Sequence, residues 1–83
     1  MHIYFEIMPS AETRLIDLQK TFGEYAGRVQ KVLEEHGSLT ARDIARLTGL
    51  RITDVFGGIG WLARDGKVSA VEYKRRILYR LNL

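Results

Sequence analysis

The stretch from Leu39 to Val71 constrains the fold of this chain more than any other part of the sequence. It contains two short amphipathic segments of helical periodicity, separated by Thr48-Gly49-Leu50, and a glycine-marked stop and a basic pair of strands follow directly. Helix, tight turn, helix and β-hairpin in this order are the layout of a winged helix-turn-helix domain. The sequence therefore predicts an α+β fold with a three-helix core and a C-terminal hairpin, the wing.

Local signals give the bounds of the first two core helices. The first is predicted over residues 24–35, and Gly37 is its stop signal. The second begins after Thr40, which is spaced from Asp43 like a capping box. It ends at Gly49, whose conformational freedom allows a sharp turn into the next helix.

The third helix and the wing complete the predicted core. The helix is expected over residues 52–64 and closes at the turn signal Asp65-Gly66. Strands are expected over residues 68–73 and 77–81, joined by the short basic link Lys74-Arg75-Arg76. The helical residues expected to face inward are Tyr25, Val29, Val32, Leu33, Ile44, Ala45, Leu47, Ile52, Val55, Ile59 and Leu62.

Residues 1–22 are interpreted as an added arm, and residues 23–83 as the winged domain. Apolar and polar residues alternate from His2 to Met8, which predicts a strand, and a helix capped by Ser10 is expected from about residue 11 to 21. An unpaired strand edge tends to find a partner, either the wing of its own chain or a second copy. Since an 83-residue chain buries a limited core, a homodimer is expected.

Composition narrows the classes of function. The chain has no cysteine, no apolar run long enough to span a membrane and no basic region before an apolar segment at its start. A cytoplasmic location is therefore expected. His2 and His36 have no partners at metal-ligand spacing, and no nucleophile has a base in reach. We expect no enzyme activity, no metal, no cofactor and no small-molecule substrate.

Charge is distributed unevenly along the chain. Residues 1–36 hold four basic and six acidic side chains, a balance of −2, and residues 37–83 hold nine basic and four acidic, a balance of +5. A basic bias on the helix-turn-helix and wing is typical of a surface that binds nucleic-acid phosphates. The residues predicted to contact double-stranded DNA are Arg42, Arg46, Arg51, Thr53, Arg64, Lys74, Arg75, Arg76 and Arg80.

The third helix is a weak reader of bases, because it lacks the Arg, Lys, Asn and Gln residues that contact base edges. Its expected outer residues are Thr53, Asp54, Gly57, Gly58, Trp61 and Arg64. Glycines cost about 1 kcal/mol each in a helix interior, which suggests a close approach by DNA, another helix or a second subunit. An alternative function is therefore a protein–protein interaction module whose interface includes Phe56, Gly57 and Trp61.

The run from Gly60 to Val68, with Ala26-Gly27-Arg28-Val29 upstream, resembles a largely uncharacterised family of small prokaryotic winged helix-turn-helix proteins. The resemblance covers about residues 25–81 and implies a compact, homodimeric winged helix that binds DNA. The leading function hypothesis is therefore a DNA-binding protein that acts as a transcription regulator. Arg51 stands where such proteins often have a Ser or Thr cap, so Thr53 is expected to cap the third helix instead.

Overall fold

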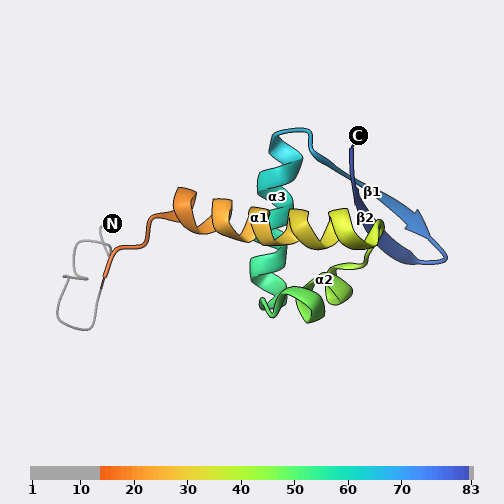
Figure 1. Ribbon diagram of the computed structural model, residues 1–83, viewed down its shortest axis with the longest axis horizontal. Coiled ribbons are helices and arrows are strands. Elements are labelled where there is room, and N and C mark those ends of the chain that lie inside the picture. Colours follow the sequence, from red (N-terminus) through yellow and green to blue (C-terminus); the bar gives the residue numbers. More distant parts are fainter. Residues whose placement is uncertain (1–13, 83) are drawn as a thin grey trace, which may run out of the picture.

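The computed structural model describes residues 14–82 and shows three helices followed by a two-stranded antiparallel sheet. The helix α1 crosses in front of α3, α2 lies beside one end of α3, and the hairpin stands at the C-terminal end of α1 (Figure 1). This arrangement confirms the predicted winged helix. The elements are α1 (Leu18–His36), α2 (Ala41–Thr48), α3 (Ile52–Arg64), β1 (Val68–Tyr73) and β2 (Arg76–Leu81).

The first helix is longer than predicted. It begins at Leu18, where the Asp17 side chain accepts a hydrogen bond of 3.2 Å from the backbone N–H of Lys20, and it passes through Gly23 without a break. The prediction of two separate helices, over about residues 11–21 and 24–35, was wrong, because one glycine weakens a helix without ending it. Residues 14–17 are not helical, and the predicted strand over residues 2–8 and the Ser10 cap lie outside the described residues.

The predicted stop and start signals around α2 are confirmed. Gly37 ends α1 at a φ of 86°, and its N–H donates to the carbonyl of Leu33. The hydroxyl of Thr40 accepts a 3.1 Å hydrogen bond from the backbone N–H of Asp43, which caps α2. Gly49 ends α2 in the left-handed conformation at a φ of 78°, a backbone geometry that favours glycine.

The core lies where α1, α2, α3 and the start of β1 meet. Its most completely buried large side chains are Val29, Ile44 and Val55, one from each helix. Most of the predicted inward residues are buried, but Leu47 and Ile52 are 40% and 41% exposed. Both lie close to the turn between α2 and α3, where the helical periodicity continues but the side chains are only partly covered.

The wing is joined to the helical core by a third short strand segment. The backbone of Leu39 exchanges hydrogen bonds of 2.8 and 3.0 Å with Tyr79, so β2 lies between this residue and β1. The register pairs Ala70 with Tyr79 and Val71 with Leu78. Since paired residues share a face, one face carries Val68, Ala70, Glu72, Ile77, Tyr79 and Leu81, and the other carries Ser69, Val71, Tyr73, Arg76, Leu78 and Arg80. Val68 is buried, so the first of these faces the core.

Candidate nucleic-acid interface

The face of α3 that no other described element covers carries uncharged and mostly small side chains. Thr53, Phe56, Gly60 and Ala63 follow one another at helical spacing, and all four are exposed. Phe56 is 49% exposed and makes an edge-to-face contact with Tyr79 of β2, with ring centroids 6.5 Å apart. This exposed face of α3, defined by the four residues named above, therefore adjoins the wing and has only the Thr53 hydroxyl to offer to a base edge.

The opposite side of α3 is covered by α1, which changes the interpretation of its glycines. A Cβ on Gly57 would lie 3.1 Å from the ring of Phe22, and one on Gly58 would lie 2.9 Å from the backbone of Tyr25. Gly57 and Gly58 are therefore not outer residues. The close partner is a helix of the same chain, one of the three possibilities that the sequence left open.

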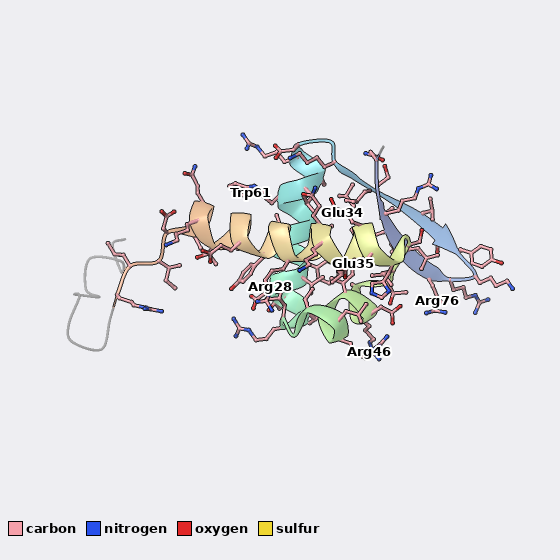
Figure 2. All side chains as sticks on the ribbon, in the orientation of Figure 1. Arg28, Glu34, Glu35, Arg46, Trp61 and Arg76 are labelled. Carbon is pink, nitrogen blue, oxygen red and sulfur yellow. The ribbon has the colours of Figure 1, made fainter. Side chains whose placement is uncertain are left out.

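Trp61 also lies away from the exposed face of α3. It is half-buried, packs against the hydrophobic core and stands beside α1 (Figure 2). Of the three residues proposed for a protein interface, only Phe56 belongs to the exposed face, because Gly57 is beneath Phe22. The sequence could not distinguish these sides, because the predicted inward residues of the helix do not show on which flank α1 crosses it.

The wing tip presents two cations on a strained turn. Tyr73 pairs with Arg76, so Lys74 and Arg75 alone form the loop, and their φ angles are 51° and 66°. A two-residue loop with both φ angles positive matches the hairpin turn that ordinarily takes Asn-Gly. The Lys74 ammonium lies 5.3 Å from the centroid of the Tyr73 ring, a cation–π contact.

The remaining wing cations are on the face that points away from the core. Arg76 and Arg80 share this face, four residues apart, and both are exposed. Arg80 lines a hollow of about 370 Å³ with Leu33 and Glu34 of α1. The wing cations thus fall into two groups, since Arg76 lies beside the tip (Figure 2) and Arg80 lines the hollow at the C-terminal end of α1.

Arg42 and Arg46 lie about one turn apart on α2. Both are exposed, and Arg46 donates a 2.8 Å hydrogen bond to Asp43 one turn earlier. This bond is the main cause that lowers the pKa of the Asp43 carboxyl below its ordinary value of 3.8, and Thr40 adds to it. Arg42 forms no ion pair within residues 14–82, so its charge is more available for a phosphate contact than that of Arg46.

Arg51 stands at the start of α3 and Arg64 at its end. The Arg51 side chain donates to Asp54 from Nε at 3.0 Å, and this pairing raises the pKa of the guanidinium. No side chain caps α3, so the expectation that Thr53 would do so was wrong. Arg51 and Arg64 are about 20 Å apart along the helix, given a rise of about 1.5 Å per residue.

One cation near the helix-turn-helix was missed by the sequence reasoning. Arg28 of α1 donates a hydrogen bond to the carbonyl of Thr48, the last residue of α2. Its guanidinium thereby satisfies a carbonyl that the helix end leaves free, and it lies near the turn between α2 and α3 (Figure 2). Contacts between an arginine and a carbonyl twenty residues away leave no local pattern in a sequence.

These positions describe a surface with an uncharged centre and cations along its flanks. The exposed face of α3 forms the centre, and the wing tip and the outer side of α2 carry positive charge. Within residues 14–82 there is no cluster of three or more metal-ligating side chains, and no helix in that range is long and apolar enough to cross a membrane. The arrangement suits contacts to a phosphate backbone better than hydrogen bonding to base edges.

Comparison with protein families agrees with this architecture. The profile of a winged helix-turn-helix domain family, DUF2582, matches residues 17–81. The chain belongs to this family. The match covers α1, α2, α3 and both strands, so all the elements described above are part of the DUF2582 domain. No curated protein matches the chain.

Several solved structures share the fold of this DUF2582 domain. Protein BT2368 from Bacteroides thetaiotaomicron, solved by NMR in solution, is 28% identical, with a TM-score of 0.72 over 76% of this chain and 77% of that one. The Zalpha domain of Carassius auratus PKZ in complex with Z-DNA is 21% identical, with a TM-score of 0.64 over 74% and 97%. The antimony-specific transcriptional repressor AntR is 22% identical, with a TM-score of 0.63 over 88% and 75%.

Proposed function

We propose that this protein is a non-enzymatic, cytoplasmic DNA-binding protein that contacts the phosphates of a duplex mainly through its wing, with transcription regulation as a possible role. The observation that carries the proposal is the turn at Lys74 and Arg75. Two long cationic side chains occupy left-handed backbone positions that Asn or Gly would occupy at lower energy. Strain of this kind persists where the side chains serve a purpose, and a protruding cation pair suits phosphate contact.

The arrangement of the other cations supports the same proposal. Arg76 lies next to the tip, Arg64 is the last residue of α3, and Arg42 is exposed on the neighbouring helix α2. Arg46 and Arg51 are already engaged by Asp43 and Asp54, so they would contribute less to binding. We therefore expect an electrostatic interaction of modest sequence specificity, in which DNA shape matters more than hydrogen bonds to bases.

Two of the solved structures support the proposal through the fold that they share with this chain. The Zalpha domain was solved with Z-DNA, and AntR is a transcriptional repressor. Each is less than a quarter identical to this chain, so what they share with it is the fold. Their functions support the proposal only in the sense that this fold can present a surface to DNA.

Fluorescence anisotropy with a random-sequence duplex across a salt series tests the proposal. The logarithm of the binding constant should fall with the logarithm of salt concentration by about 0.9 for each phosphate neutralised. The double variant Arg75→Ala, Arg76→Ala should lower that slope by about 2, because it removes two contacts. Binding that shows no salt dependence, or a slope that the variant leaves unchanged, would contradict binding through the wing.

A matched control removes one positive charge far from the wing. Arg14 is exposed and precedes α1, whose N-terminal end lies at the side of the described structure opposite the hairpin (Figure 1). Arg14→Ala should leave the salt slope within error of the wild type, whereas Arg75→Ala should lower it by about 1. Equal effects of the two variants would mean that net charge, not a wing contact, sets the affinity.

A second candidate function is protein–protein interaction through the exposed face of α3. It is favoured by Phe56, a large aromatic side chain that is 49% exposed at the centre of this face. Aromatic residues with this degree of exposure are common anchors at protein interfaces. Phe56→Ala should then abolish capture of a protein partner and leave the salt slope of DNA binding unchanged. Loss of DNA binding with no effect on any protein complex would exclude this candidate.

A further inference from the structure

Two glycines lie inside α1 at positions where the described fold does not require them. Gly23 and Gly27 are about one helical turn apart, and a Cβ built on either would meet nothing within 4 Å. Glycine is the least favourable residue after proline in a helix interior. The longest helix of the described chain therefore carries two destabilising residues with no compensating contact inside residues 14–82.

The glycines of α3 provide the contrast. A Cβ on Gly58 would lie 2.9 Å from the backbone of Tyr25, so the crossing of α1 and α3 needs a glycine there. Gly27 precedes the buried Val29 by two residues and is therefore on nearly the opposite side of α1 from the core. Among residues 14–82, no atom lies within 4 Å of a Cβ built on Gly23 or Gly27, so no described element packs against α1 at these two positions.

Positively and negatively charged residues alternate along this side of the helix around the two glycines. Six residues make up the outer face of α1: Lys20, Gly23, Glu24, Gly27, Lys31 and Glu34. All four charged members are exposed, and none of them forms an ion pair within residues 14–82. Glu34 accepts one long hydrogen bond of 3.4 Å, from the side chain of Gln30.

Along the outer face of α1, an antiparallel second copy of the helix would place each of these charges near an opposite charge. Lys20 precedes Gly27 by seven residues and Glu34 follows it by seven, two helical turns in each direction. If two copies of α1 cross antiparallel at Gly27, Lys20 of each copy faces Glu34 of the partner subunit, and Glu24 lies close to Lys31 of the partner subunit. A parallel pairing would instead place like charges together.

We propose that the outer face of α1 is the docking surface for a second copy of this chain, in an antiparallel pair with two-fold symmetry. The missing side chains at Gly27 and Gly23 allow the two backbones to approach closely, as small residues do where helices cross. The two symmetric Lys20–Glu34 contacts fix the register. A two-fold pair is the commonest form of self-association. The inference does not depend on DNA binding.

Charge exchange tests the register directly. Lys20→Glu and Glu34→Lys should each raise the dimer dissociation constant about tenfold at low salt, because each converts two attractive contacts into repulsive ones. The double variant Lys20→Glu, Glu34→Lys restores opposite charges and should return to within about twofold of the wild type. All three should remain folded, since an acid near the start of a helix and a base near its end are favourable.

A pair of glycine variants serves as test and matched control in sedimentation equilibrium. Gly27→Gln places a bulky side chain at the proposed crossing and should give a monomer that is still folded, because glutamine favours helix. Gly60→Gln makes the same change at an exposed helical glycine of α3, whose Cβ would also meet nothing within 4 Å, and should leave the dimer intact. A wild type that stays monomeric at millimolar concentration overturns the proposal, as does a dimer that persists in Gly27→Gln or one that the charge exchange fails to restore.

Discussion

Replacing the wing-tip residues with those that the backbone there prefers should both stabilise the protein and weaken the DNA binding proposed above. The double variant Lys74→Asn, Arg75→Gly keeps a two-residue hairpin loop but removes both cations. The wild-type residues have φ angles of 51° and 66°, in the region that L-residues with a long side chain adopt at a cost of about 1 kcal/mol or more each. Asn and Gly adopt this region readily.

Three contributions determine the net change in the free energy of unfolding. Relief of strain at two positions gives about 2 kcal/mol. Loss of the contact between Lys74 and the Tyr73 ring costs about 0.5 kcal/mol at an exposed site. The greater freedom of glycine in the unfolded chain costs about another 0.5 kcal/mol. The free energy of unfolding should therefore rise by about 1 kcal/mol, which raises Tm by about 4–8 °C for a domain of this size.

Thermal unfolding followed by circular dichroism measures the first effect, and the salt series with duplex DNA measures the second. The matched control is Lys74→Ala, Arg75→Ala, which removes the same charges but keeps a Cβ at each strained position. Both variants should lose about 2 units of salt slope, and only the Asn-Gly variant should gain stability. If the two variants have equal Tm values, the argument from backbone strain is refuted, and an unchanged slope refutes the phosphate contacts.

Three further outcomes are expected from the packing and caps of the helices. Gly58→Ala should destabilise the protein by about 1–3 kcal/mol in urea titrations, because the added Cβ would lie 2.9 Å from the backbone of Tyr25. Gly60→Ala, where the added Cβ meets nothing within 4 Å, should instead stabilise it by up to about 1 kcal/mol. A Gly58→Ala variant as stable as the wild type would contradict the close crossing of α1 and α3. Thr40→Ala should lower the free energy of unfolding by about 1 kcal/mol through loss of the α2 cap, and an unchanged urea midpoint would count against that cap. Folding lowers the pKa of Asp43, so the contribution of this carboxylate to stability is complete above its ordinary value of 3.8 and is lost as pH falls through the lower folded value. The Tm difference between wild type and Asp43→Asn should therefore shrink below about pH 4 and be constant above about pH 5.

The sequence predicted those parts of the fold that depend on local signals. Thr40, Gly37 and Gly49 each act through hydrogen bonds or backbone conformation within a few residues, and the structure confirms all three. The bounds of α3 also agree with prediction, because Asp65-Gly66 closes the helix locally. The continuation of α1 through Gly23 was not predicted, since one glycine is compatible both with a break and with an uninterrupted helix, and local signals do not decide between them.

The candidate site was predictable in composition but not in arrangement. A cluster of basic residues at 74–76 is visible in the sequence, and a turn between two alternating strands is a local signal. Which side of α3 is open depends on where α1 crosses it, and only the structure shows that Trp61 lies on the covered side. The assignment of Arg76 and Arg80 to the outer face of the wing likewise required the strand register.

The position of α1 has a consequence for how two copies could engage DNA. This helix covers one side of α3, so its own outer face and the exposed face of α3 point in opposite directions. In a pair joined across α1, the two α3 helices would therefore face away from each other and could not enter successive grooves of one palindromic site. Such a pair would link two separate duplexes, and bridging or compaction of DNA would be the activity to look for.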